Sequence, residues 1–300
     1  MLNSDSSLQY LDNSFIYLKN NEKTKRVLCN SILLSKFANP NIYKKMKQLK
    51  FLMVAFTLLM GISLTSCLDN GDNNPIKEMS AIVKYEGSMY GGVFKMIDGS
   101  ELEPSDVMQT IDLVSGKMYA IYFSYNINDV VANKATKITL LATPSNISGP
   151  EVVASEYAST ANAPMYALDY NEGYYNYYPY MFDKHTMIFY ALFWVKDVTS
   201  KDDIAEEIKK HRFEISYDAV KGGVLNLYVN HLIDEEKETE RTKYTVNTYA
   251  YDLQPIIDEV ANEGSTINKI IVHAKVNSSK NSLENAMDKT YEIDYSKLNN

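Results

Sequence analysis

Short stretches in which hydrophobic and polar residues alternate dominate the chain between residues 78 and 143. Such alternation is typical of β-strands, and Gly87 and the dipeptide Asp98-Gly99 provide turns between them. In the stretch 117–125 both alternating faces are largely apolar, as expected where one face lines a core and the other packs on a neighbour. About five strands in about 65 residues predict a small barrel of the OB type over residues 78–143.

A second block of strands is predicted over residues 182–297. The run 186–195 is almost wholly apolar and predicts a central buried strand, while 212–217 and 224–232 alternate on either side of a glycine pair, a hairpin signal. Further strands are expected at 244–253, 267–276 and 290–295, a short helix at 201–210, and a helical turn from Pro255 to Ala261. Many short strands separated by turns predict an antiparallel β-sandwich. The predicted fold class is therefore mainly β, an OB-like barrel followed by an antiparallel sandwich.

Between the two blocks, residues 144–181 are interrupted by prolines and glycine, which predicts a linker. This segment contains an unusual concentration of tyrosine, and the rings concerned are Tyr170, Tyr174, Tyr175, Tyr177, Tyr178 and Tyr180. They either pack between the domains and cover a sheet edge, or form an exposed binding surface for a glycan or a protein partner. The second interpretation rests on the large rigid contact area and polar tip of tyrosine.

Near the beginning of the chain, a basic stretch at 46–50 is followed by an apolar run at 51–64 and by small residues before Cys67. This order is that of a secretory signal peptide, here residues 46–66, and the apolar run is shorter than the ~20 residues that span a bilayer. Leu64-Thr65-Ser66-Cys67 is similar to the lipobox of bacterial lipoproteins. That resemblance implies cleavage before Cys67, a diacylglycerol on its thiol, and an acyl chain such as palmitate on its amine. A secretory peptide that happens to end in cysteine is the alternative.

The segments flanking the signal peptide are polar. Residues 1–45 are rich in Asn, Ser and Lys without sustained periodicity, so we interpret them as a disordered, overlong gene start, with Met46 as the initiator. A functional cytoplasmic extension is the alternative. Residues 67–77 predict an acidic tether, which resembles the surface-export signal of some Gram-negative lipoproteins. We therefore expect a protein of the cell envelope, in the outer membrane, with the membrane as its partner through lipid on Cys67.

Removal of residues 1–66 changes the charge of the protein. The mature chain of 234 residues keeps 21 basic and 35 acidic side chains, a net charge of −14 against −8 for the whole chain. Such a chain repels phosphate backbones, so no nucleic-acid partner is expected. Cys29 is removed and Cys67 is consumed by lipid, so no thiol is left for a disulfide, a metal or catalysis.

The sequence contains no motif with a known catalytic mechanism, such as a nucleophile elbow, a phosphate-binding loop or a zinc-binding helix. The four histidines lie at least 20 residues apart, although His211 and His231 could meet if their strands pair. His231 is the best single candidate for a polar site, and a structural histidine at a strand end is the alternative. The charge run 234–243 predicts a solvated loop. We therefore expect no catalytic residue, no metal and no cofactor, and thus a protein that is not an enzyme.

Several segments resemble the NigD-like lipoproteins. They are the signal and its lipobox at 46–70, a strand with an Asp-Gly turn and a Leu-Glu-Pro-Ser close at 92–105, and strands at 116–123, 225–231 and 249–253. The resemblance covers nearly all of the mature chain and implies an OB-like domain followed by a β-sandwich. No catalytic residues come with the family.

The NigD-like family is similar to a protein of a bacteriocin operon. The resemblance therefore implies a non-catalytic envelope protein that binds a protein partner and gives bacteriocin immunity. This chain departs from the family pattern in its less acidic tether and in its tyrosine-rich segment. A surface glycan-binding lipoprotein that uses this tyrosine-rich segment is the alternative function.

Overall fold

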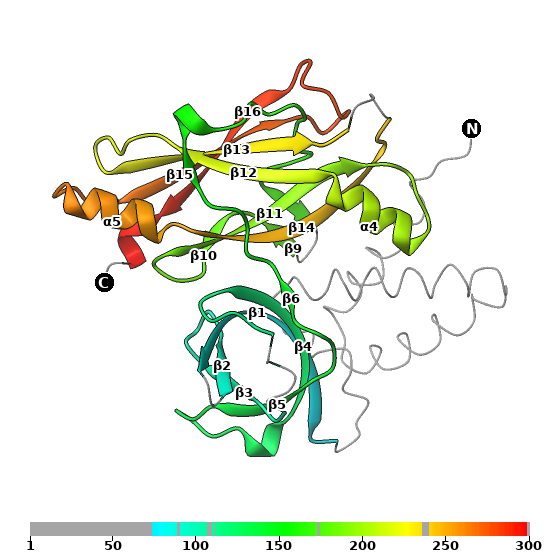
Figure 1. Cartoon of the computed structure of the whole chain (residues 1–300), viewed down its shortest axis with the longest axis vertical. Helices are drawn as coiled ribbons and strands as arrows, with labels where there is room; N and C mark the ends of the chain where they lie inside the picture. Colours follow the sequence, from blue (N-terminus) through cyan, green and yellow to red (C-terminus); the bar gives the residue numbers. More distant parts are fainter. Residues whose placement is uncertain are drawn as a thin grey trace, which may run out of the picture. The chain divides into compact units, whose positions relative to one another are not determined.

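The computed structural model describes residues 74–88, 91–106, 110, 112–172, 175–235 and 240–298. The signal peptide, Cys67, most of the tether and the segment 1–45 lie outside the described residues. The described part is mainly β, as predicted from the alternation pattern (Figure 1). Within it, no helix has the length and apolar character that crossing a membrane requires.

Five strands form a closed barrel. They are β1 (Ile76–Ser88), β2 (Gly91–Lys95), β3 (Glu101–Pro104), β4 (Met118–Asn126) and β5 (Thr136–Leu140). The hydrogen-bonded order is β1-β2-β3-β5-β4, and β4 also pairs with β1 over nine residue positions, which closes the sheet on itself. Closure pairs the backbone N–H and C=O groups that the edge strands of an open sheet would expose. The predicted OB-like barrel is confirmed.

The inward positions of these strands fill the barrel. Residues that are at most 1% exposed include Val83, Phe94, Ile121, Phe123 and Ile138. Tyr85 lies across the register pair Gly87 and Gly92 at the β1–β2 hairpin. A Cβ atom at Gly87 would lie 2.5 Å from the Tyr85 ring, and one at Gly92 would lie 2.5 Å from its hydroxyl, so both positions require glycine.

Two further sheets form the sandwich. The three-stranded sheet has the order β10 (Tyr180–Met181), β11 (Thr186–Val195) and β14 (Lys243–Asp252). The five-stranded sheet has the order β16 (Met287–Asp294), β15 (Lys269–Val276), β13 (Val224–Ile233), β12 (His211–Tyr217) and β7 (Val153–Ala154). A two-stranded sheet of β8 (Tyr170–Glu172) and β9 (Tyr175–Tyr177) and the short β6 (Ser145–Asn146) complete the strands.

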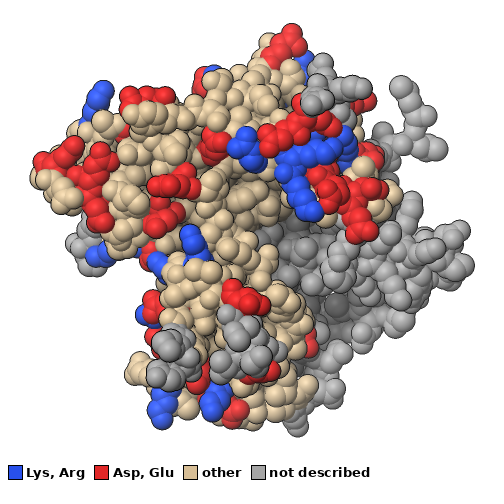
Figure 2. All heavy atoms as spheres, viewed as in Figure 1, with Lys and Arg blue, Asp and Glu red and all other residues tan. Residues whose placement is uncertain are grey.

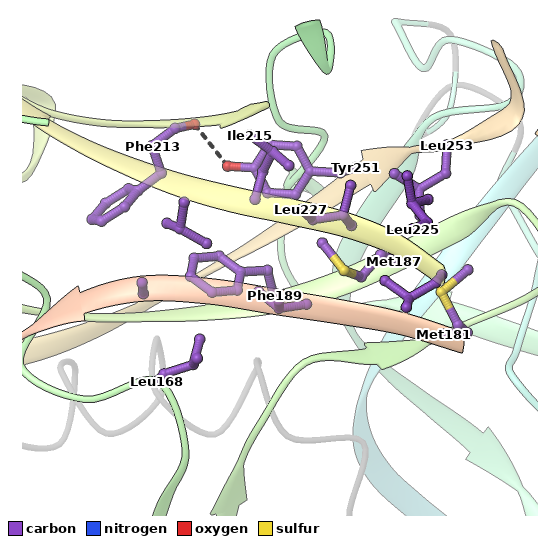
Figure 3. Close-up of a cluster of buried hydrophobic side chains, with 14 of the residues drawn as sticks. Leu168, Met181, Met187, Phe189, Phe213, Ile215, Leu225, Leu227, Tyr251 and Leu253 are labelled. Carbon is purple, nitrogen blue, oxygen red and sulfur yellow. Dashed lines mark hydrogen bonds between the residues drawn. The ribbon is translucent and has the colours of Figure 1, made fainter. Parts of the chain in front are cut away.

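The apolar run of β11 is explained by burial on both of its faces. Met187 and Phe189 face the five-stranded sheet and belong to the main core of the sandwich (Figure 3). Ile188 and Leu192 point to the opposite side, into a second cluster that also contains barrel residues such as Ile82. Successive side chains of a strand point to opposite faces, so a strand buried on both faces is apolar at every position.

The five-stranded sheet is mixed, although the hairpin pattern predicts antiparallel pairing. β13 pairs in parallel with β15, and β12 pairs in parallel with β7. The chain leaves β13 for β14, which lies in the other sheet, and returns through helix α5 (Gln254–Asn262) to β15. Such a crossover brings β15 beside β13 in the same direction.

The helix predicted at 201–210 is present as α4 (Lys201–Lys209). The Ser200 hydroxyl caps it by accepting the backbone N–H of Asp203 over 3.0 Å. Acidic residues lie in its first turn and Lys209 in its last, in line with the helix dipole. Helix α5 has Pro255 in its first turn, as predicted.

The segment 144–181, predicted as a linker, contributes side chains to the cores. Ile147, Met165, Leu168 and Tyr177 are each between 1 and 6% exposed. Met165 and Leu168 belong to the main core of the sandwich, while Ile147 and Tyr177 belong to the second cluster. This segment is therefore packed against the strands rather than standing as an open spacer.

Candidate functional site

The tyrosine-rich segment does not form one exposed surface. Tyr177 is 2% exposed, so it is a core residue rather than a contact residue. Its ring stacks on Tyr170 with centroids 6.3 Å apart and meets Tyr190 of β11 edge-on at 5.6 Å. Tyr180 is half-buried, and burial beside Tyr190 raises the pKa of its hydroxyl. These rings cover a face of the three-stranded sheet, which agrees with the first of the two interpretations of the segment.

Tyr178 is the exposed ring among the members of this segment whose side chains are described. It is 39% exposed and stacks on Tyr291 of β16, with ring centroids 5.4 Å apart and planes 13° apart. Tyr291 is the register partner of the core residue Val272, so it points toward the core side of the sheet. Tyr174 and the side chain of Tyr175 lie outside the described residues.

β16 is the outer strand of the five-stranded sheet. Its one strand partner among the described residues is β15. The backbone N–H and C=O groups on its other side therefore form no hydrogen bonds with a strand of the described residues. Most of its residues are exposed, and they include Asp288, Lys289 and Glu292. Charged residues on an outer strand discourage unspecific pairing with other chains. We call Tyr178, Tyr291 and the outer edge of β16 the β16 edge surface.

The two histidines that could meet do so. β12 and β13 pair antiparallel, and this register places His211 Nδ1 2.9 Å from His231 Nε2. His231 Nδ1 lies 2.9 Å from the carbonyl oxygen of Pro164, which can only accept, so His231 carries its proton on Nδ1. His231 Nε2 then accepts the proton of His211 Nδ1. The predicted proximity of the two residues is confirmed.

This histidine pair is buried and uncharged at neutral pH. Burial lowers the pKa of His211 to about 4 and the pKa of His231 to about 3. The ring of Phe213 stacks on His231, with centroids 4.5 Å apart, and Phe193 packs against His211 at the same centroid distance. Both the aromatic packing and the backbone bond to Pro164 are typical of a structural role, which was the alternative interpretation of His231.

Next to the histidines lies a buried ion-pair network. Arg241 Nε donates to Glu207 Oε1 over 2.7 Å, and Arg241 Nη2 donates to Glu235 Oε2 over 2.8 Å. Lys196 Nζ also donates to Glu235, over 2.7 Å. Burial alone would raise the pKa of Glu207, but the positive charge of Arg241 and hydrogen bonds to the carboxylate outweigh it and lower that pKa.

The prediction of a solvated loop over 234–243 is wrong for the two residues that join this network. Arg241 is 6% exposed, and Glu235 is half-buried. The cause is Glu207 on α4, whose buried carboxylate needs a cation.

Among the described residues, no group of three or more His, Cys, Asp or Glu side chains is arranged to hold a metal ion.

A groove of about 620 Å³ lies on the outward face of the five-stranded sheet, and we call it the sheet groove. Its floor is formed by outward positions of β12, β13 and β15, including Ser216, Tyr228 and His273. Its walls are the segment 155–161, which contains the short helix η4 (Ser155–Tyr157), and residues between 283 and 288. This site could not be predicted from the sequence, because it depends on the parallel pairing of β13 with β15.

Basic and acidic side chains lie next to one another on the face drawn in Figure 2, and the described residues of this face carry no broad basic patch. Several cations of the described residues are paired with carboxylates, such as Arg212 with Asp234 over 2.9 Å. Positive charge that is neutralised in this way does not attract phosphate backbones.

A closed OB-like barrel followed by a β-sandwich defines the structural class of this protein. Among solved structures, the chain is similar to a "putative lipoprotein" from Bacteroides fragilis, with 30% sequence identity and a TM-score of 0.61 over 73% of this chain and 98% of that one. At this identity and coverage, the chain belongs to the same family as this lipoprotein, as the lipobox of the sequence predicts.

Two other solved structures are similar at lower identity. A protein of unknown function from Bacteroides vulgatus has 10% identity and a TM-score of 0.46 over 73% of this chain and 91% of that one. A NigD-like immunity protein from Bacteroides caccae has 12% identity and a TM-score of 0.39 over 74% of this chain and 99% of that one. Comparison with protein-family models and with curated proteins gives no match.

Proposed function

We propose that this protein is a non-catalytic lipoprotein of the outer membrane, anchored by lipid on Cys67, that binds a protein partner and gives immunity to a bacteriocin. The anchor is supported by the signal peptide and lipobox and by membership of a lipoprotein family. The acidic tether supports the outer membrane, because it resembles the export signal of Gram-negative surface lipoproteins. The immunity role is supported by the resemblance to the NigD-like lipoproteins.

The observation that carries the proposal is the stacked pair of Tyr178 and Tyr291 at the β16 edge surface. Tyrosine is enriched where proteins bind one another, because its ring gives a large contact area at a small cost in conformational entropy. Tyr178 is exposed, while Tyr291 is anchored against the core, so the stack holds Tyr178 in one position before a partner arrives.

The edge of β16 also offers backbone hydrogen-bonding groups to a partner. Unpaired N–H and C=O groups on an outer strand can form a ladder with an extended segment of another protein. The eight-residue length of β16 is enough for such a ladder. Its charged residues, which are mostly acidic, would favour a partner strand that carries basic side chains.

Two features support a binding role over an enzymatic one. His211 and His231 are at most 4% exposed and hydrogen-bonded, so neither offers a base that a substrate could reach. Glu207 is held by Arg241 in an ion pair of 2.7 Å, which keeps this carboxylate ionised and occupied. A general acid or base needs to be accessible and to have a pKa near the working pH.

The alternative of a glycan-binding surface on the tyrosine-rich segment has less support. Tyr177 is in the core and Tyr170 is half-buried, so these rings cannot offer their faces to a sugar. Tyr178 alone, among the members whose side chains are described, is exposed, and Tyr291 already covers one face of it.

Expression of the chain in a bacteriocin-sensitive Bacteroides strain tests the proposal. We expect survival on the bacteriocin with the wild-type protein, and loss of survival with Tyr178→Ala or Tyr291→Ala at equal protein levels. Tyr157→Ala is the matched control, because this tyrosine is 77% exposed and belongs neither to the Tyr178–Tyr291 stack nor to β16. Sensitivity that the wild-type protein does not change, or survival that both variants retain, would contradict the proposal.

A further inference from the structure

We propose that the sheet groove binds a neutral saccharide, a ligand that goes beyond the protein partner proposed above. The volume of the groove, about 620 Å³, is within the range of sites for small ligands. Its lining combines short polar side chains, small apolar side chains and two flat rings. Long charged side chains are more common on the outward face of a sheet.

The two rings on the floor provide a stacking surface. Tyr228 and His273 are register partners on β13 and β15, and their rings stack with centroids 4.7 Å apart and planes 20° apart. On its other side, the register partner of Tyr228 is Ser216 on β12, which has a short side chain. No bulky outward side chain of β12 therefore stands opposite the Tyr228 ring. The C–H face of a pyranose packs on the electron-rich face of such a ring.

Hydrogen-bonding groups beside these rings are fixed in place. The Tyr228 hydroxyl donates to Asp218 Oδ2 over 2.8 Å. His273 Nε2 donates to Asn226 Oδ1 over 2.9 Å. The Nδ1 atom of the neutral ring therefore carries no proton and can accept a hydrogen bond from a hydroxyl group. A carboxylate and an imidazole nitrogen that are already oriented pay little entropy when they bind the hydroxyl groups of a sugar.

The charges of the groove disfavour an anionic ligand. Lys275 is the cation in its lining, and its Nζ lies 2.7 Å from Asp288 Oδ1, so it is already neutralised. Ser159, Thr160 and Asn230 add uncharged donors and acceptors. A phosphate or sulfate group needs unpaired cations or free N–H groups, and these lining side chains do not supply the cations.

The position of the groove also distinguishes a saccharide from a peptide strand. An extended peptide adds to the edge of a sheet, where main-chain groups are unpaired. The groove lies over β13 and β15, and each of these strands has a paired neighbour on both sides. Recognition here must therefore use side chains, which suits a ligand rich in hydroxyl groups.

Affinity electrophoresis of the full-length protein in detergent tests the proposal. Native gels contain laminarin, yeast mannan or amylopectin as neutral polysaccharides, and heparin as a sulfated one. We expect retardation in at least one neutral gel, with a dissociation constant that rises by about tenfold or more in Tyr228→Ala, the loss of one good contact. Asp218→Asn changes an exposed side chain and keeps its size, so it should fold and weaken binding severalfold.

Tyr122→Ala is the matched control. Tyr122 is half-buried on β4 of the barrel, and its hydroxyl donates to Glu78 just as the Tyr228 hydroxyl donates to Asp218. This variant should be retarded like the wild-type protein. Migration unaffected by all three neutral polysaccharides, retardation by heparin alone, or retardation that Tyr228→Ala and Asp218→Asn both leave unchanged would overturn the proposal. Bacteriocin survival is not measured in these gels, so their result is independent of the immunity role.

Discussion

His211 Nδ1 and His231 Nε2 share a hydrogen bond of 2.9 Å between two residues that are at most 4% exposed. The bond is directional, because Pro164 accepts the proton of His231 and thereby leaves His231 Nε2 free to accept from His211. A second ring proton on either histidine would therefore place a positive charge in a buried part of the sandwich, beside Phe193 and Phe213.

This relationship predicts that the protein loses stability as the pH falls below about 6.5, the pKa of an unfolded histidine. The folded pKa values are lower, about 4 for His211 and about 3 for His231, so between pH 6.5 and pH 4 the unfolded chain binds more protons than the folded one. Each histidine should lower the free energy of unfolding at pH 5 by about 2 kcal/mol relative to its value at pH 7.5. Urea denaturation at the two pH values measures this difference.

The double variant His211→Gln, His231→Gln is the control for that measurement. It should be less stable at pH 7.5, by about 1–3 kcal/mol, because the buried hydrogen bonds are disturbed. Its stability should change much less between pH 7.5 and pH 5. An equal loss in the wild-type protein and in this variant would show that other groups cause the pH dependence.

The ion pair between Glu207 and Arg241 gives a second prediction. Arg241→Met leaves the Glu207 carboxylate buried without its main cation, and should reduce the free energy of unfolding by about 3–5 kcal/mol. Lys209→Met breaks the exposed pair with Glu206, whose side chains are 70% and 67% exposed, and should cost less than about 1 kcal/mol. Urea denaturation compares the two. Similar losses in both variants would show that Arg241 does not serve the buried carboxylate.

A third prediction separates two adjacent tyrosines. Tyr177→Ser removes a ring from the core and should reduce the free energy of unfolding by about 3–5 kcal/mol. Tyr178→Ser removes a ring that is 39% exposed and should cost about 1 kcal/mol. Thermal denaturation followed by circular dichroism distinguishes them. If Tyr178→Ser is the more damaging of the two, Tyr178 acts in folding rather than in binding.

The strands could be predicted from the sequence where a local pattern decides the structure. The apolar run of β11 predicts a buried strand, and the alternation on either side of Gly222 and Gly223 predicts the β12–β13 hairpin. That hairpin is also what brings His211 to His231. In these cases the residues in contact lie within about 20 positions of one another and are joined by a single turn.

Contacts between distant segments could not be predicted in this way. Glu207 and Arg241 are separated by β12 and β13, and nothing in either residue's neighbourhood indicates the other. The sheet groove depends on the crossover through α5, which places His273 beside Tyr228. Tyr177 and Tyr178 are adjacent in the same tyrosine-rich segment. The contact of the Tyr177 ring with Tyr190 of β11 decides which of the two is buried.

A fourth prediction concerns the anchor. The lipobox predicts that the mature chain begins at Cys67 and carries lipid on it. Mass spectrometry of the protein extracted from membranes should show a chain of 234 residues with acyl groups on Cys67, and Cys67→Ser should appear as an uncleaved or released form. A wild-type protein that is recovered without lipid, or that retains residues 1–45, would contradict both the anchor and the start at Met46.

The last prediction concerns the division into two folding units at residues 144–181. Cleavage needs an exposed and locally adaptable backbone, and within this segment Tyr157 is 77% exposed, whereas Met165, Leu168 and Tyr177 are in the cores. Brief chymotrypsin treatment should therefore cut first after Tyr157. Because the barrel and the sandwich each have a core cluster of their own, both fragments should keep β-type circular dichroism once they are separated. Tyr157→Ser should delay the cut without changing the melting temperature. Fragments that both unfold on separation would show that the cluster containing Ile82, Ile188 and Tyr177 holds the two blocks together as one folding unit.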